Sequence, residues 1–281
     1  MKTKTLTGKH IGIAILDTGI FPHRDFYGRI RGFMDFVNGQ KAPYDDNGHG
    51  THVAGIAGGN GAAWKGKYCG IAPECDLIVC KVLDKNGNGD ARQVIQALEW
   101  IKKNQLHYGI RIVNISVGTT QKSTHEDLIR AVEDAWDEGL IVVAAAGNMG
   151  PGPGTITAPG SSRKIITVGS SDMLLKNQGI SGRGPTDTCI VKPDIVAPGN
   201  QIISCANRME PMPYMIKSGT SMSTPVVSGG IALLLEKSPS LTNLNIKKRL
   251  RTTAKDLGYP HNLQGWGLFC LENFLNEKNS S

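Results

Sequence analysis

The sequence has no apolar run of the roughly 20 residues that a transmembrane helix needs, and its longest runs, such as residues 140–146, are only as long as a strand. Its first ten residues are polar and basic, and they lack the apolar segment of a secretory signal peptide. These absences lead us to expect a cytoplasmic protein without a membrane partner. Secretion stays open, because a longer precursor could carry the signal.

Cysteine is sparse and scattered. The chain has six cysteines, and no two of them form a CxxC pair. This scatter resembles neither a disulfide scaffold nor a zinc ribbon. We therefore expect reduced thiols with structural roles. A disulfide stays open among Cys69, Cys75 and Cys80, which lie close together in the sequence.

Aromatic residues make up only 6% of the chain, so no aromatic platform for RNA accompanies the net charge of +7. Zinc-finger spacing is also absent. The one dense basic cluster lies at residues 247–251, within a helical pattern. We interpret this cluster as a solvated helix face, and we expect no nucleic-acid partner.

Short β-branched runs alternate with helical patterns along the chain. The apolar runs predict strands covered on both faces, and the alternation predicts a mostly parallel sheet. The expected fold is an α/β three-layer sandwich, with helices flanking the sheet, in a single domain over residues 1–281. Strands are expected at 11–16, 76–83, 110–117, 140–146 and 164–168, and helices at 49–57, 91–104, 126–138, 225–237 and 244–255.

Three segments carry an aspartate, a histidine and a serine beside glycines. Asp17 ends an apolar strand, where sites gather in open α/β sheets, and His49 opens a helix of small residues. Ser221 lies where a buried helix begins. Alone, Asp17 is a turn residue and Ser221 a helix N-cap. Together the three supply a nucleophile, a base that titrates near neutral pH and a carboxylate that orients the base.

His49 and His52 also have the spacing of a metal pair on one helix face. No glutamate lies between them in the HExxH manner, and no third ligand is apparent. We therefore expect no zinc here and interpret His52 as a structural histidine.

The segments DTG (17–19), HGTHVAG (49–55) and GTSMSTP (219–225) resemble the three signature blocks of the subtilisin-like serine proteases, in that family's order. The resemblance extends over about residues 8–271. It implies a serine endopeptidase that hydrolyses protein or peptide substrates through an acyl-enzyme and needs no cofactor for catalysis. Ser221 would attack, His49 would act as base and then acid, and Asp17 would orient His49.

Residues 144–148 resemble the family segment that carries the oxyanion-binding asparagine. This resemblance implies that Asn148 donates its side-chain amide to the developing oxyanion beside the Ser221 N–H. Residues 116–118 resemble the segment whose backbone pairs with the substrate, and residues 86–89 resemble the opposite wall of the cleft. The expected substrate contacts are Ser116, Val117, Gly118, Ala145, Gly147 and Thr220.

Two departures from the family pattern concern specificity. Met149 follows Asn148, where several secreted relatives have an acidic residue, and Thr157 occupies a small-residue position of the specificity pocket. We therefore predict a preference for apolar residues before the cleaved bond.

A structural calcium ion stays open, and no metal ligands are assigned. The loop at residues 58–70 is glycine-rich and offers few carboxylates, unlike the calcium loop of secreted subtilisins. Asp25 resembles a family calcium ligand. Asp45, Asp46 and Asp172 are weaker candidates.

Two further hypotheses are kept. A catalytically silent protein with this fold would usually lose a member of the triad, and here all three are present. A basic nucleic-acid-binding α/β protein would leave the three blocks unexplained.

The absence of a signal peptide and a propeptide, together with the cysteine content, resembles the intracellular subtilisins. His49 argues against the sedolisins, which use a glutamate as the base. The oligomeric state is open.

Overall fold

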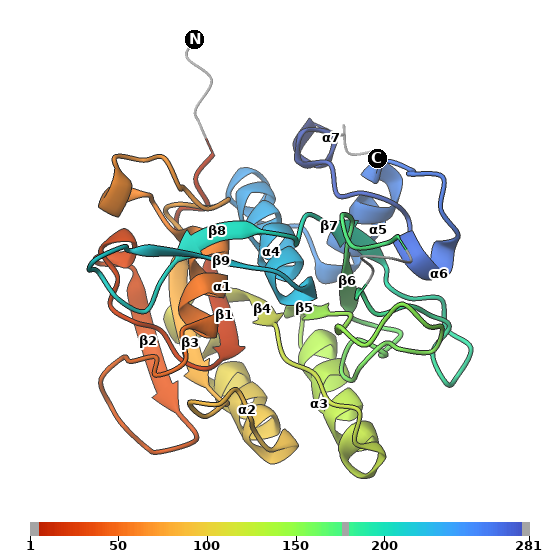
Figure 1. Ribbon diagram of the computed structural model, residues 1–281, viewed down its shortest axis with the longest axis horizontal. Helices are drawn as coiled ribbons and strands as arrows, with labels where there is room; N and C mark the ends of the chain where they lie inside the picture. Colours follow the sequence, from red (N-terminus) through yellow and green to blue (C-terminus); the bar gives the residue numbers. More distant parts are fainter. Residues whose placement is uncertain (1–5, 176–179, 277–281) are drawn as a thin grey trace.

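Seven parallel strands form the central sheet of the computed structural model, which describes residues 6–175 and 180–276 (Figure 1). The strands follow one another across the sheet as β2 (Ile30–Asp35), β3 (Asp76–Lys81), β1 (Gly12–Asp17), β4 (Ile110–Ile115), β5 (Ile141–Ala145), β6 (Ile166–Ser170) and β7 (Ile195–Ala197). A separate antiparallel hairpin pairs β8 (Ile202–Cys205) with β9 (Tyr214–Lys217).

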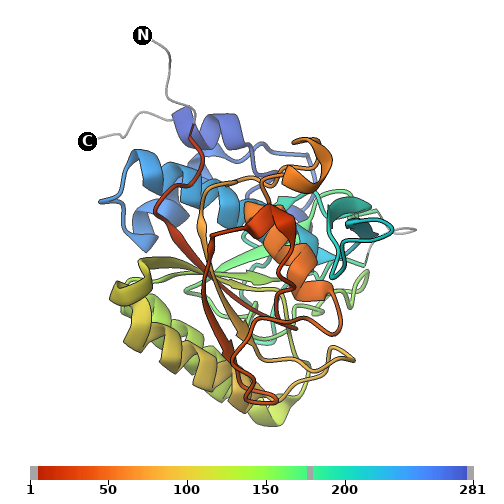
Figure 2. The ribbon, with the colours of Figure 1, turned by 90° about the vertical axis from the view of Figure 1, so that its left-hand side faces the viewer.

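Helices cover both faces of this sheet. In Figures 1 and 2, α2 (Ala91–Tyr108) and α3 (His125–Asp137) lie on one side, and α1 (His49–Gly58) and α4 (Thr220–Lys237) lie on the other. The remaining helices are α5 (Asn243–Thr253), α6 (His261–Gln264) and α7 (Leu271–Asn276), with single 3-10 turns η1 (Arg24–Phe26), η2 (Ala62–Trp64) and η3 (Lys122–Thr124). The predicted three-layer α/β sandwich is confirmed. A single domain across residues 1–281 stays a prediction.

The five expected strands are β1, β3, β4, β5 and β6, and the sequence patterns missed four others. Every residue of β1 and β5 is buried, as expected for strands covered by helices on both faces. By contrast, β2 is an edge strand of mixed polarity, β7 has three residues, and β8 and β9 have four each. Such short or mixed segments carry too little periodicity to be recognised.

Helix α4 begins five residues before the expected start at residue 225. Nearly all of its residues are buried, so no amphipathic stripe marks its boundary. Pro225 is its sixth residue and lies inside the helix.

Helix α2 is bounded by local signals that the sequence displays. Asp90 and Gln93 form a reciprocal capping box at its start, and Gly109 ends it with a φ of 61°. Among the described residues, no helix combines the length and the apolar character that a membrane crossing requires.

Candidate active site

Asp17 and His49 meet at the carboxyl end of β1. Asp17 is the last residue of that strand, has no exposed surface and lies beside His49, the first residue of α1. The His49 Nδ1 atom lies 2.7 Å from Asp17 Oδ1, and the N–H of Thr18 donates to the same oxygen at 2.7 Å. A Cβ atom at Gly50 would lie 2.2 Å from the carbonyl oxygen of Gly19, so glycine is needed for this close approach.

The environment of His49 favours its protonated form. Burial by itself lowers the pKa of His49, but the charge of Asp17 and the hydrogen bond to it outweigh burial, so the pKa is raised above its ordinary value. Lys217 opposes this rise and Asp45 adds to it. With Nδ1–H directed at Asp17, the neutral ring presents Nε2 as a proton acceptor.

Asp45 organises the entrance of α1. Its Oδ1 accepts hydrogen bonds from the Thr18 hydroxyl at 2.9 Å and the Gly48 N–H at 2.8 Å, and its Oδ2 accepts from the N–H and hydroxyl of Thr51. Burial raises the pKa of Asp45, but these donors outweigh burial, and the pKa is lowered. The sequence analysis missed this role, although Thr18 stands inside the DTG block.

Ser221 is the second residue of α4 and is buried. Its Oγ donates to the carbonyl oxygen of Ser116 at 2.9 Å, and the hydroxyl of Ser116 donates to the carbonyl oxygen of Ser221 at 3.1 Å. In this structure the described residues show no hydrogen bond between Ser221 and His49. A transfer of the Ser221 proton to His49 would require this hydroxyl to turn away from Ser116.

Asn148 lies beside the turn that precedes Ser221. Its Oδ1 accepts hydrogen bonds from the N–H and the hydroxyl of Thr220, at 3.0 and 3.1 Å. Since Thr220 holds the oxygen, the amide nitrogen is left to donate elsewhere. A Cβ at Gly219 would lie 3.1 Å from that nitrogen, and the φ of Gly219 is +146°, a second reason for glycine in this turn.

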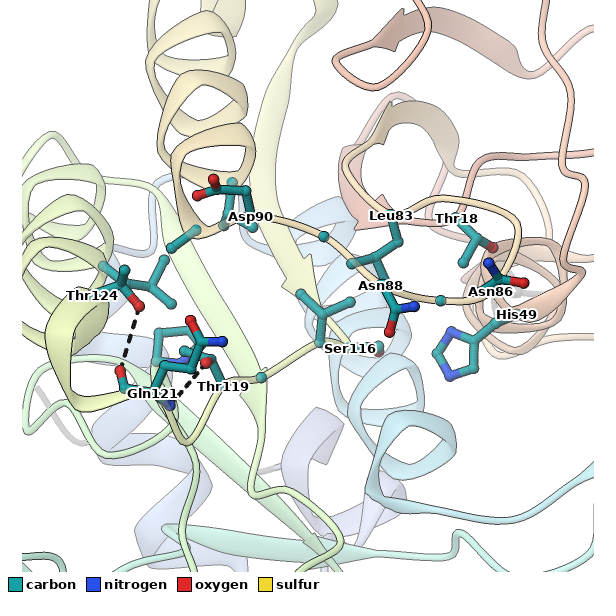
Figure 3. A pocket seen from close by; sticks show the side chains of 18 of the residues that line it. Thr18, His49, Leu83, Asn86, Asn88, Asp90, Ser116, Thr119, Gln121 and Thr124 are labelled. Carbon is teal, nitrogen blue, oxygen red and sulfur yellow. Dashed lines mark hydrogen bonds between the residues drawn. The ribbon is translucent and has the colours of Figure 1, made fainter.

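Two cavities meet along residues 116–118. A groove of about 590 Å³ runs past His49 between the segment 86–91 and the start of α3, as Figure 3 shows. A second cavity, of about 290 Å³, contains Ser221 and Asn148. All six expected substrate contacts line this second cavity: Ser116, Val117, Gly118, Ala145, Gly147 and Thr220. Met149 and Thr157 line it too.

Asp25 does not fit the calcium ligand that the resemblance suggests. Its Oδ2 accepts hydrogen bonds from the Gly61 N–H at 3.1 Å and the Tyr214 hydroxyl at 2.9 Å, and its Oδ1 accepts from the Ala63 N–H at 2.8 Å. Its potential metal-binding neighbours, His23 and Cys205, are buried with it. Calcium requires six to eight oxygen ligands, whereas this carboxylate anchors the loop at 58–70 through N–H and O–H donors.

The carboxylates of the other calcium candidates also accept hydrogen bonds from groups of this protein. Asp45 binds the start of α1, and Asp46 Oδ1 lies 2.7 Å from the ammonium of Lys81. Asp172 accepts from the hydroxyl of Ser170 and the N–H of Gly199. These contacts do not test a calcium site, and a structural calcium ion stays a prediction.

His52 and three of the six cysteines, Cys75, Cys80 and Cys205, lie in the buried structural surroundings that the sequence suggested, whereas Cys69 and Cys189 are exposed. The His52 Nε2–H donates to the carbonyl oxygens of Ile202 and Met215, at 3.0 and 3.1 Å, and ties α1 to the hairpin. Burial lowers the pKa of His52 to about 4 and keeps the ring neutral. All six cysteines are free, including Cys75 and Cys80, so the disulfide left open above is not formed.

Comparison with known proteins defines the class to which this geometry belongs. The chain is 42% identical over 297 residues to the serine protease AprX of Bacillus subtilis (strain 168), covering 96% of this chain and 67% of that relative. It is 38% identical over 264 residues to subtilisin Savinase of Lederbergia lenta, covering 94% of this chain and 90% of the relative. Among solved structures, Sphericase is similar at a TM-score of 0.80 and 31% identity, covering 95% of this chain and 94% of the other.

These similarities are those of a subtilisin-like serine endopeptidase, an enzyme that hydrolyses proteins or peptides. Residues 8–267 match the model of the subtilase family, peptidase S8, and the chain belongs to that family. Catalysis in this family needs no cofactor. No finding favours the catalytically silent alternative.

Proposed function

We propose that Asp17, His49 and Ser221 form the catalytic triad of this endopeptidase. The observation that carries the proposal is the 2.7 Å contact between His49 Nδ1 and Asp17 Oδ1, which fixes the tautomer that leaves Nε2 as base. Ser221 attacks the substrate carbonyl after passing its proton to His49, and His49 then protonates the leaving amine. The Asp17 carboxylate stabilises the imidazolium that forms between these steps.

Asn148 and the backbone N–H of Ser221 bind the oxyanion. Thr220 holds the oxygen of the Asn148 side chain, so the amide donor is oriented before substrate arrives. Donors fixed in advance do not have to reorganise when charge develops, which is why they stabilise a transition state efficiently. Residues 116–118 present backbone groups to an extended substrate between the two cavities.

The second cavity receives the residue before the cleaved bond and prefers an apolar one. No charged side chain is among its lining residues, which include Val117, Ala145 and Met149. A buried lysine or arginine of the substrate would find no carboxylate there to offset its desolvation. A cytoplasmic location and the absence of nucleic-acid and membrane partners stay predictions.

The triad is tested with a fluorophosphonate probe, which labels activated serines. The wild-type chain is expected to be labelled, and Ser221→Ala is expected to lose the label while keeping its circular dichroism spectrum. Labelling of Ser221→Ala at the wild-type rate would place the reactive serine elsewhere. Folded wild-type protein that resists the probe would refute an activated Ser221.

A further inference from the structure

Lys81 is a charged residue buried at the carboxyl end of β3. It ends β3, which reads Asp-Leu-Ile-Val-Cys-Lys, and its side chain has no exposed surface. In the sheet register it lies between Asp17 of β1 and Asp35 of β2. Removing an ammonium from water is costly, so a buried lysine persists only where its charge and its donors are matched. The partners of Lys81 therefore indicate its role.

Each of the three N–H donors of the ammonium has one acceptor. The Lys81 Nζ atom lies 2.7 Å from the carbonyl oxygen of Thr18, 2.7 Å from Asp46 Oδ1 and 2.9 Å from the carbonyl oxygen of Leu83. It also lies 5.0 Å from the centre of the Tyr44 ring, within the range of a cation–π interaction. The ammonium is fully occupied by this chain and has no donor left for substrate.

Each acceptor belongs to a segment that reaches the active site. Thr18 follows Asp17 and donates its own N–H to the Asp17 carboxylate. Asp46 precedes His49 by three residues. Leu83 lines the groove and begins the segment that forms one of its walls. In Figure 3, Thr18, Leu83 and His49 gather at the same end of the groove.

The ion pair itself gives a weak reason to keep this lysine. Asp46 has 37% of its side chain exposed, so water can solvate its carboxylate when the ammonium is absent. Replacing a buried ion pair by an apolar residue of similar volume is often neutral for stability. Stability alone therefore does not account for a lysine whose three hydrogen bonds all end on active-site segments.

We propose that Lys81 is a positioning residue of the active site, which holds the Asp17 segment, the His49 segment and the groove wall at fixed distances from one another. Lys81 touches neither substrate nor the reacting atoms, and it acts through the three segments. A misplacement of about 1 Å in a catalytic site can cost a hundredfold in rate. This proposal rests on the proposed triad, since it assigns Lys81 the placement of two triad members.

The test compares the wild type, Lys81→Met and Ser221→Ala at a temperature at which all are folded. Active-site titration with the fluorophosphonate counts competent molecules, so that kcat refers to each working site. Two substrates are used: a tetrapeptide anilide that occupies the groove and a small ester that does not reach it. Lys81→Met is expected to lower kcat on both substrates by about a hundredfold. It is also expected to raise KM severalfold on the tetrapeptide alone.

The matched control is Lys102→Met, on α2. Lys102 is also largely buried and also pairs with carboxylates, those of Glu99 at 2.7 Å and Glu138 at 3.3 Å, but it does not line the groove. It is expected to lose thermal stability without a change in kcat for each titrated site. Where Lys81→Met does not fold, Asp46→Ala replaces it, because that variant removes one partner at a partly exposed position.

The outcomes separate the two proposals. A wild type that is labelled, together with a folded Lys81→Met variant whose titrated kcat is within threefold of wild type on both substrates, would overturn the role of Lys81 and leave the triad intact. A lower kcat with the same KM change on both substrates would equally contradict the link to the groove wall. A wild type that is not labelled at all would instead overturn the triad.

Discussion

Pro225 leaves the carbonyl oxygen of Ser221 without its helical donor, and the hydroxyl of Ser116 donates to that oxygen at 3.1 Å. In an α-helix the N–H of residue 225 would bond to the carbonyl of residue 221, but proline has no N–H. The carbonyl that lacks a helical donor is therefore free to accept from Ser116, the residue that follows β4. In this structure Ser221 thus binds Ser116 through both its carbonyl oxygen and its hydroxyl.

This relationship predicts that Pro225→Ala restores part of the stability that Ser116→Ala loses. Ser116→Ala leaves a buried carbonyl without its donor and is expected to cost about 1 kcal/mol of unfolding free energy. The alanine at position 225 supplies an N–H that can donate to the Ser221 carbonyl, four residues before it in the helix. The change in unfolding free energy caused by Pro225→Ala should therefore be about 1 kcal/mol more favourable when Ser116 is alanine than when it is serine. Urea unfolding of the four variants, all carrying Ser221→Ala to prevent autolysis, measures this coupling.

Ser223→Ala is the control for that cycle. The Ser223 hydroxyl is buried in the same helix, and no hydrogen-bond partner for it is found among the described residues. Its removal should neither destabilise the protein nor couple to Pro225→Ala. Additive effects of Ser116→Ala and Pro225→Ala would show that the N–H of residue 225 does not replace the Ser116 donor.

Asp17→Asn should move the pH dependence of activity as well as its size. Asp17 raises the pKa of His49 against the effect of burial, so kcat/KM of the wild type should fall as pH decreases through a value above the ordinary 6.5. The amide removes the charge, and burial then lowers the pKa, so the acid limb should move to lower pH. The remaining kcat should be roughly 10⁴-fold smaller, because the amide favours the wrong tautomer. Rates measured from pH 5 to 10 give both quantities, and an unmoved acid limb contradicts the assigned cause.

The expected triad residues were found through three short blocks that resemble the family's signatures, and their catalytic roles stay a proposal. Asp17 follows an apolar strand, and His49 and Ser221 stand at helix starts, so strand ends and glycine turns already place them at one edge of the sheet. Lys81 could not be predicted in the same way. Its three acceptors come from separate segments, and only the folded register brings them to one atom.

The carboxylates illustrate the same limit. Asp25 was a candidate calcium ligand by its resemblance to the family and Asp45 a weaker candidate, and nothing in the sequence shows where neighbouring N–H groups point. In the structure, the loop backbone at Gly61 and Ala63 donates to Asp25, and the start of α1 donates to Asp45. The sequence shows that these positions are aspartates. It does not show their hydrogen-bond partners, because these depend on loop conformation, which has no periodic pattern in the sequence.

Met149→Asp should change the preference for the residue before the cleaved bond. The wild type is expected to cleave after leucine or phenylalanine in preference to lysine, because the cavity lacks a charged residue. A carboxylate at its rim should shift the ratio of kcat/KM values for lysine over leucine at least tenfold, a change of about 1.4 kcal/mol. Leu175→Asp, at an exposed position outside the cavity, is the matched control. A wild type that prefers lysine contradicts the proposed specificity.

Lys247 was expected on a solvated helix face, but its side chain is only 18% exposed, and it should make folding stability rise with pH. Burial lowers the pKa of Lys247 to about 8, against the opposing effect of Asp194, and its Nζ donates to the carbonyl oxygens of Arg163, Lys164 and Ile165. In the unfolded chain a lysine titrates near 10.4. Between these two values the unfolded chain binds more protons than the folded one, so stability increases with pH in that window.

Lys247→Met should remove this component. The unfolding free energy of the wild type relative to Lys247→Met should rise by on the order of 3 kcal/mol between pH 7.5 and pH 10.5, since each unit of pKa corresponds to about 1.4 kcal/mol. Urea unfolding at both pH values, again in the Ser221→Ala background, measures the difference. Lys248→Met, at the exposed neighbouring position, should leave the pH dependence unchanged. The unfolding free energies of the wild type and Lys247→Met could instead change with pH in parallel. That result would mean that Lys247 loses its proton at the same pH in the folded and unfolded chain, because its three carbonyl acceptors fully offset its burial.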